Sequence, residues 1–313
     1  MEKLLIIDFF NLMHRAFHAY PKDFKNSRGE PTGAVYGFFV LLLNYIKKTT
    51  PTHILIAYED DEVPTFRSTA YTGYKANRTW AEDHKEESEA FYLQVPVALK
   101  ILDTLNFKVT KVNGFEADDV AGTFATKVNK NVQVLILSND QDLLQVVSQN
   151  VSVLRPARPP FVKEKIFNPA EVQKTYGFTP IQLIDYKALR GDPSDNIKGV
   201  KGIGEVSAKK LIAEFGSVEN IYKNISQISS KKIQTLLANN YEEALMSKKL
   251  ATIETNVPME VDINKCKISY VQNPKTKELF EEYEFKSLLK KLEELFPIIK
   301  ESEADYTQSL FKY

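Results

Sequence analysis

The sequence predicts an α/β fold with a central parallel sheet flanked by helices, followed by a smaller helical subdomain. Three short apolar runs are typical of buried parallel strands, and helical stretches such as residues 37–47 and 118–127 separate them. In doubly wound sheets the carboxyl ends of the strands border the active crevice, so acidic residues at those ends should converge. Each run is closely followed by one: residues 4–7 by Asp8, residues 54–58 by Asp60, and residues 132–137 by Asp140.

Residues 74–102 interrupt this alternation, because they are polar and charged and carry scattered aromatic side chains. Trp80, Phe91 and Tyr92 lie within or beside runs such as residues 81–87, in which most side chains are charged. We interpret the segment as a mobile, partly helical excursion from an α/β core that spans residues 1–178.

From about Thr179 onward the pattern is helical, and short glycine-rich turns divide the helices. This pattern predicts a helical subdomain over residues 179–298 and a flexible tail over residues 299–313. The turns lie at Gly191, Gly199, Gly202, Gly204 and Gly216.

The composition excludes several classes of protein. Lysine plus arginine and aspartate plus glutamate both total 41, so binding to nucleic acid would require local segregation of charge. The first apolar run is too short for a signal peptide, and no stretch is long and apolar enough to cross a membrane. The single cysteine, Cys266, cannot form an internal disulfide and is expected to be a packed thiol. Together these features indicate a cytoplasmic protein.

Acidic residues form the strongest chemical pattern. Glu116, Asp118 and Asp119 lie where a helix should begin, and Glu116 and Asp119 share one helical face. Asp61 and Glu62, by contrast, are interpreted as solvated charges. The complete set of candidate metal ligands is Asp8, Asp60, Glu116, Asp118, Asp119, Asp140, Asp142, Asp192 and Asp195.

So many carboxylates in one crevice require cations, since they would otherwise raise one another's pKa values and take up protons. Oxygen ligands without a cysteine or histidine cluster favour two Mg²⁺ or Mn²⁺ ions over zinc. Two such ions about 4 Å apart can activate water on one side of a phosphodiester and stabilise the leaving oxygen on the other. Taken alone, the pattern indicates a metal-dependent phosphoryl-transfer enzyme. The alternative is that each acidic residue is a helix cap or a solvated charge.

Several motifs resemble the 5′-nuclease family, which comprises the 5′-3′ exonucleases, the flap endonucleases and the 5′-nuclease domain of the bacterial DNA polymerase I type. The resemblance extends from about residue 3 to about residue 296. It implies a PIN-like nuclease core, and it makes the excursion at residues 74–102 a helical arch under which single-stranded 5′ ends pass. The motifs occur in the family's order at residues 5–8, 15–18, 29–37, 65–67, 74–78, 116–119, 138–142 and 191–197.

The resemblance also implies roles for individual residues. It makes all of the candidate carboxylates direct or water-mediated ligands of the catalytic metals. It makes Lys75 and Arg78 the basic groups that steer the scissile phosphate and neutralise its charge. Arg15, Arg67 and Tyr74 are expected to contact DNA. For Tyr74, stacking on a base and packing at a helix end are both open.

A few positions depart from the family pattern without removing a ligand. Glu59 precedes the second aspartate where an apolar residue is usual, and Gln141 replaces a usual lysine. Thr79 and Trp80 stand where prolines commonly follow Asn-Arg. These departures concern the arch and the charges around the second aspartate.

Residues 199–204 form a glycine-rich loop ahead of a helix start, where backbone amides bind phosphate without sequence preference. The loop resembles a helix-hairpin-helix at about residues 187–216, part of a three-turn-helix motif that holds duplex DNA with a K⁺ ion on loop carbonyls. The alternative is a packing corner between two helices. Lysines in and after the loop form a local basic stripe suited to DNA phosphates, and Lys187 and Arg190 extend it on the N-terminal side. The predicted DNA contacts here are Lys198, Gly199, Lys201, Gly202, Gly204, Lys209 and Lys210.

These observations predict a structure-specific 5′ nuclease, both exonuclease and flap endonuclease, that hydrolyses DNA at flaps, nicks, gaps and branches and also removes RNA primers. Alternatives are a non-catalytic DNA-binding homologue and a PIN-type RNase. Expected partners are DNA, RNA–DNA hybrids and a DNA polymerase acting in trans, and we expect a monomer in a bacterial or phage-infected cell. Residues 309–311 (Ser-Leu-Phe) resemble a sliding-clamp peptide, although simple fraying is the other interpretation of that tail.

Overall fold

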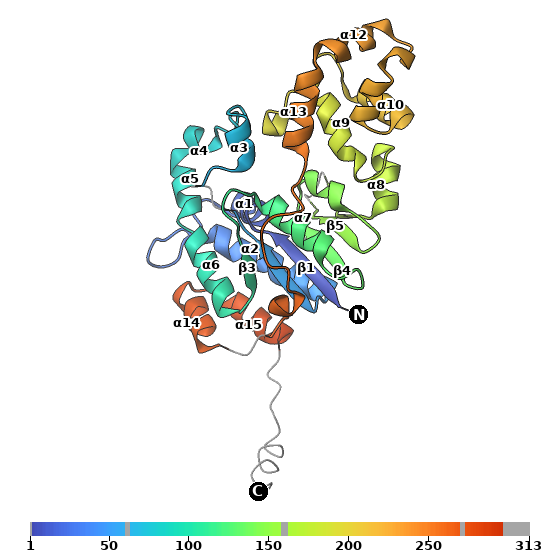
Figure 1. Cartoon of the computed structure of the whole chain (residues 1–313). Coiled ribbons are helices and arrows are strands. Elements are labelled where there is room, and N and C mark those ends of the chain that lie inside the picture. Colours follow the sequence, from blue (N-terminus) through green and yellow to red (C-terminus); the bar gives the residue numbers. More distant parts are fainter. Residues whose placement is uncertain (1, 60–62, 158–161, 270–272, 297–313) are drawn as a thin grey trace.

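The centre of the protein is a mostly parallel, six-stranded sheet with the strand order β3-β2-β1-β4-β5-β6 (Figure 1). The structure is a computed structural model and describes residues 2–59, 63–157, 162–269 and 273–296. All neighbouring strands pair in parallel except β5 and β6, which are antiparallel. The strands span Lys3–Asp8 (β1), His53–Ala57 (β2), Lys108–Thr110 (β3), Gln133–Leu137 (β4), Val151–Arg155 (β5) and Lys165–Phe167 (β6).

Helices cover both faces of the sheet, which confirms the predicted fold class. Alternate residues of β1 point to opposite sides, as the strand period of two requires. Leu5 and Ile7 join one apolar cluster, whereas Leu4 and Ile6 join another. The first cluster contains α1 (Phe9–Ala19), α2 (Gly33–Thr49) and α6 (Val95–Thr104), and the second contains α7 (Ala117–Lys127).

Beyond the sheet the chain forms a group of helices that stands off one end of the molecule (Figure 1). Apolar residues of this group, such as Leu211 and Ile212, belong to the same cluster as Val120 of α7, so the core continues into it. The helices are α8 (Pro169–Tyr176), α9 (Gln182–Arg190), α10 (Glu205–Phe215), α11 (Val218–Lys223), α12 (Lys231–Asn239) and α13 (Tyr241–Ala251). Short 3-10 helices span Asp142–Val146, Pro193–Asp195, Ile225–Gln227 and Ile263–Cys266.

The last two described helices return to the α/β core, which corrects the predicted extent of the helical subdomain. After α13 the chain runs back along α7, where the amide of Glu254 donates to Asp119 at 2.8 Å. Helices α14 (Pro274–Glu282) and α15 (Lys286–Leu295) then pack against the α2 side of the sheet (Figure 1). Phe280 and Leu292 are fully buried in the same cluster as Phe39. Residues 179–298 are therefore not one spatial unit, because an amphipathic helix pattern does not specify the surface that it covers.

The expected arch is shorter than the polar segment that predicted it. Helices α3 (Phe66–Ala70), α4 (Trp80–Asp83) and α5 (Lys85–Tyr92) rise beside the carboxyl edge of the sheet (Figure 1). Residues 95–102 instead belong to α6, where Ala98 and Ile101 are fully buried. Phe91 is also fully buried, so its aromatic ring contributes to the core and is not available to a single strand.

Some predictions fall on residues that the structure does not describe. Asp60 and its neighbours Asp61 and Glu62 lie outside the described residues, as does the tail with its clamp-like residues 309–311. Within the described part of the chain, every helix is too short or too polar to span a lipid bilayer.

Candidate active site

The ends of β1 and β4 bring two predicted carboxylates together. Asp8 is the last residue of β1 and caps α1, accepting from the amide of Asn11 at 3.2 Å. Asp140 follows β4. The Ser138 hydroxyl joins the two, because it donates to Asp8 at 2.7 Å and accepts from the Asp140 amide at 3.0 Å. The parallel pairing of β1 with β4 therefore fixes both acidic residues at one edge of the sheet.

The amino terminus of α7 adds more carboxylates to this edge. Glu116 and Asp119 form a capping box, so each side chain accepts from a backbone amide at the helix start. Asp118 lies in the first turn, where the helix dipole favours negative charge. Glu59, just beyond β2, accepts from the Ala117 amide at 3.2 Å. Sequence reasoning had noted Glu59 only as a departure, yet its place directly after an apolar run could have predicted this position.

These groups line a cleft of about 1660 Å³ between the sheet edge and the arch. Basic and aromatic side chains line it too, including Arg15 on α1 and the arch residue Trp80. Among the described carboxylates, the cleft is lined by Asp8, Glu59, Asp83, Glu116, Asp118 and Asp140.

Burial and mutual repulsion raise the pKa values of several of these groups. Burial raises the pKa of Asp8 to about 6 and that of Glu59 to about 7. Burial, followed by the nearby charges of Asp140 and Asp8, raises the pKa of Asp118 well above its usual range. Burial also raises the pKa of Asp140. A site that destabilises its own negative charge in this way is suited to a cation.

Lys75 and Arg78, at the base of the arch, already pair with two other carboxylates. Lys75 donates to Glu116 at 2.7 Å, and Arg78 donates to Asp195 at 2.6 Å. The Tyr74 hydroxyl lies between these carboxylates, 3.1 Å from Glu116 and 3.2 Å from Asp195. Only 7% of Tyr74 is exposed, which agrees with the packed-aromatic alternative and not with stacking on a base.

Asp142 and Asp192 share an internal cation. The amine of Lys187 is buried and forms ion pairs with both carboxylates. Although burial alone would raise the pKa of Asp192, Lys187 and Ser194 lower it. The prediction that Lys187 belongs to a DNA-facing basic stripe was therefore wrong. Lys187 lies one helical turn after Leu183, another buried residue of α9, and this spacing could have indicated that Lys187 is buried too.

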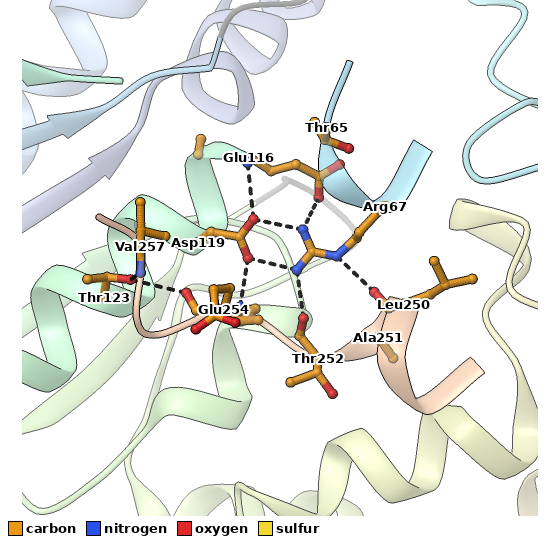
Figure 2. Close-up of polar contacts among 12 residues, drawn as sticks. Thr65, Arg67, Glu116, Asp119, Thr123, Leu250, Ala251, Thr252, Glu254 and Val257 are labelled. Atoms are coloured by element: carbon orange, nitrogen blue, oxygen red, sulfur yellow. Dashed lines mark hydrogen bonds and ion pairs between the residues drawn. The ribbon is translucent and has the colours of Figure 1, made fainter. Parts of the chain in front are cut away.

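Arg67 is an internal strut and not a DNA contact, which corrects a second prediction (Figure 2). Only 2% of it is exposed. Its guanidinium forms a two-pronged ion pair with Asp119, both contacts being 2.7 Å, and also reaches Glu116 at 3.1 Å. Its remaining donors bind the carbonyls of Leu250 at 3.0 Å and Thr252 at 2.6 Å. Arg67 thus joins α3, α7 and the end of α13.

This strut also removes Asp119 from the expected set of metal ligands. Asp119 is 0% exposed, and both of its oxygens accept from Arg67 and from the backbone amides of Glu116 and Glu254 (Figure 2). Within the described residues, no three histidine, cysteine, aspartate or glutamate side chains are arranged as a metal site. Asp8, Asp118 and Asp140 form no ion pair with another described residue and best fit a hard divalent cation.

The glycine loop leads into α10. Gly199 has a φ of 65° and lies against Gly191, where a Cβ would approach the Gly191 nitrogen to 2.2 Å. Gly202 has a φ of 91°. Gly204 caps α10 with ordinary extended backbone and has open space where a side chain would lie. Of the predicted lysines, Lys198, Lys201 and Lys210 are exposed, and Lys209 pairs with Glu205 at 2.7 Å.

His14 and Trp80, two aromatic residues that line the cleft, pack around the buried ring of Phe91. His14 stacks on Phe91 with 4.2 Å between ring centroids, and its ring lies 5.7 Å from that of Trp80. Burial, followed by the charges of His18 and Arg78, lowers the pKa of His14 to about 4.

This shift predicts a dependence of stability on pH. Between about pH 6.5 and pH 4 the unfolded chain binds a proton at His14 that the folded protein does not, so the free energy of unfolding falls as the pH falls. The contribution is at most about 3 kcal/mol. Urea unfolding at several pH values should show a shallower acid decline for His14→Gln than for the wild type. Identical declines would contradict the assignment.

Two family models match nearly the whole of this arrangement. The N-terminal, resolvase-like domain of 5′-3′ exonucleases matches residues 3–177, and the C-terminal SAM fold of 5′-3′ exonucleases matches residues 178–274. The chain therefore belongs to the 5′-3′ exonuclease family.

Curated relatives include the DNA polymerase I of Bacillus subtilis, which is 35% identical over 310 residues, or 99% of this chain and 34% of the relative. The thermostable DNA polymerase I of Thermus thermophilus is 38% identical over 262 residues, or 83% of this chain and 30% of the relative. The chain thus spans about a third of the length of these relatives.

Among solved structures, the bacteriophage T5 flap endonuclease, in a complex with DNA and metal ions, has a TM-score of 0.69 at 22% identity, covering 90% of this chain and 100% of that one. The catalytic core of Rad2, in a complex with a DNA substrate, has a TM-score of 0.58 at 14% identity, covering 94% and 92%. At these identities the likeness supports the fold.

Proposed function

We propose that this chain is a structure-specific 5′ nuclease that hydrolyses DNA phosphodiesters next to a junction between single strand and duplex, using divalent cations. The observation that carries the proposal is the cleft itself. It is lined both by buried carboxylates with raised pKa values and by the cations Lys75 and Arg78, a combination that suits a phosphate bound with metal ions.

Asp8, Asp118 and Asp140, with Glu116 beside them, are the residues that would hold Mg²⁺ or Mn²⁺. When bound, such ions activate water and stabilise the leaving oxygen of a phosphodiester. Asp60, predicted to belong to this set, lies outside the described residues. Asp142, Asp192 and Asp195 already pair with Lys187 and Arg78, so we assign them a supporting, water-mediated role.

Lys75 and Arg78 are proposed to orient the scissile phosphate. Both are cations at the rim of the cleft, and both now pair with carboxylates that a metal ion would attract. A phosphate arriving with its metal ions would replace Glu116 and Asp195 as their partners. Lys75 and Arg78 would then stabilise the negative charge that develops on the phosphate in the transition state, and they would do so without reorganisation of water.

The glycine loop is proposed to hold the duplex, because it offers backbone amides at the start of α10 and exposed lysines around them. The K⁺ ion expected on its carbonyls belongs to the same proposal. Arg15 lines the cleft, where its guanidinium donates to the carbonyl of Ala157, and we propose that it contacts the single strand. We infer a monomer that acts in the cytoplasm alongside a DNA polymerase. The clamp contact rests only on residues outside the described part of the chain.

The test compares three labelled substrates: a 5′-flap duplex, a blunt duplex and single-stranded RNA. We expect cleavage near the flap junction in Mg²⁺ or Mn²⁺, and no cleavage in EDTA. Binding of the flap without cleavage in either metal would identify the non-catalytic alternative. A preference for single-stranded RNA would identify the PIN-type RNase.

The glycine loop offers a clean substitution for a second test. Gly202→Val would strain the backbone, whereas a Cβ added at Gly204 has no neighbouring atom within 4 Å in the free protein. A side chain there would separate the α10 amides from a phosphate, so we expect duplex affinity to fall roughly tenfold, or about 1.4 kcal/mol. Thermal unfolding should be unchanged, and flaps of unrelated sequence should lose affinity equally because the contacts are to the backbone.

The lysines beside the loop provide an independent measurement. Lys198→Ala with Lys201→Ala should reduce the slope of log affinity against log salt by up to about two phosphate contacts. The matched control is Lys127→Ala with Lys130→Ala. Both lysines are exposed, and they lie at and just beyond the C-terminal end of α7, whereas the carboxylates lie at its N-terminal end. If Gly204→Val and both lysine pairs bind DNA like the wild type, the loop is a packing corner and the duplex is held elsewhere.

A further inference from the structure

The base of the arch is docked directly onto the segment that leads into the glycine loop. The backbone amide of Lys75 donates to the carbonyl of Asp195 at 3.0 Å. In the opposite direction, the side-chain amide of Asn196 donates to the carbonyl of Gly73 at 2.6 Å. Asn77 adds a third bond, from its side-chain amide to the carbonyl of Pro193 at 2.7 Å.

The backbone on both sides of this contact has unusual geometry. Lys75 has a φ of 55° and Asn196 has a φ of 56°, both in the left-handed region. Asparagine tolerates that region, but for lysine it costs about 1–2 kcal/mol, so neighbouring contacts must hold the residue there. The bonds from Lys75 to Asp195 and from Asn196 to Gly73 hold the backbone just before the strained residue, and the Arg78 amide, which donates to the Lys75 carbonyl at 3.0 Å, holds the backbone after it.

The same segment is rigidly connected to the glycine loop. Asp192 and Ile197 exchange two backbone hydrogen bonds of 2.8 Å, which close a tight loop around Asn196. Ile197 is buried in an apolar cluster with Tyr74 and Leu250. Only Lys198 separates this buried residue from Gly199, so a shift of the glycine loop would be transmitted to the peptide that precedes Lys75.

We propose that Asn196 is a positioning residue that couples the duplex-holding loop to the placement of the Lys75 amine. Its side chain bonds to the arch and does not reach the carboxylates, so it acts through Lys75 and not on the substrate. Engagement of duplex at the glycine loop and alignment of Lys75 are then one conformational event. This inference rests on the proposed function and identifies how that site senses a correctly seated substrate.

The test is Asn196→Gly, which preserves left-handed backbone and removes only the amide side chain. At saturating 5′-flap DNA, the single-turnover cleavage rate should fall roughly 10- to 100-fold, as expected for a misplaced reacting group. The dissociation constant for the flap in EDTA should change less than about threefold. Asn106→Gly is the matched control: Asn106 also has a φ of 56° and donates its side-chain amide to Ser269 at 3.0 Å, away from the cleft.

A double-mutant cycle with Lys75→Ala decides whether Asn196 acts through Lys75. In the Lys75→Ala background, Asn196→Gly should cause no further loss of rate. Full additivity, or a wild-type rate for Asn196→Gly, would overturn the proposal. If Asn196→Gly does not fold, the exposed Asn77→Ala should lower the rate in the same direction, and an unchanged rate would overturn it. A wild-type protein that fails to cleave the flap would instead refute the proposed function.

Discussion

Asp118→Asn is expected to reduce cleavage of a 5′ flap by at least about 1,000-fold, equivalent to about 4 kcal/mol of transition-state stabilisation. Asp118 lines the cleft, and Asp140 and Asp8 lie close enough to raise its pKa further after burial has raised it. The substitution keeps the shape of the side chain but removes an anionic oxygen that a divalent cation requires. Single-turnover cleavage in Mg²⁺ measures the loss.

The same variant should be more stable than the wild type in EDTA, because a neutral amide removes repulsion among the buried carboxylates. Thermal unfolding with and without Mg²⁺ checks this, and the wild type should gain more from Mg²⁺ than the variant does. Flap binding in EDTA should persist. Asp103→Asn, exposed on α6, is the control. Unchanged cleavage by Asp118→Asn, or destabilisation in EDTA, would show that Asp118 serves the fold and not the chemistry.

Arg67→Ala is expected to lower the free energy of unfolding by about 3–5 kcal/mol, the usual effect of removing one partner of a buried ion pair. Asp119 would stay buried without a cation, and the carbonyls of Leu250 and Thr252 would each lose a donor. Urea denaturation measures the change. Because Arg67 also bonds to Glu116, activity should fall even at temperatures where the variant is folded.

Two further variants separate the contributions of Arg67. Arg67→Lys keeps the charge but cannot reproduce the two-pronged contact, so its loss of stability should be intermediate. Arg28→Ala removes an exposed arginine that pairs with Glu30 and Glu282, and it should lose far less. If Arg67→Ala and Arg28→Ala are equally stable, the strut does not hold the fold. If Arg67→Ala weakens only DNA binding, the earlier assignment to DNA contact was right.

Much of this fold could be predicted because its signals are local. The run from Leu4 to Ile7 is too short for a helix and fully apolar, so a buried strand ending at Asp8 followed directly. Convergence of Asp8 with Asp140 then required only the rule that ligands bind at the carboxyl ends of parallel strands. The motif at residues 116–119 likewise indicated a helix start that carries carboxylates.

The missed features depend on partners far away in the sequence. Arg67 and Lys187 look like DNA contacts as single basic residues, and only the folded chain reveals the buried carboxylates that claim them. The amphipathic pattern of α15 predicted a helix but not its return to α2. Glu59 directly follows an apolar run, which indicates its place at the edge of the sheet, but its bond to the Ala117 amide joins residues that are far apart in the sequence.

The return of α14 and α15 makes the α8–α13 unit an insertion whose two ends are both anchored in the α/β core. A unit tethered at two points can rock about the line that joins its anchors, but it cannot swing away as a domain on a single linker does. The distance between the glycine loop, where we propose that the duplex binds, and the carboxylates is then nearly constant. We therefore expect the protein to cut at a fixed number of nucleotides from the junction, whatever the sequence of the DNA.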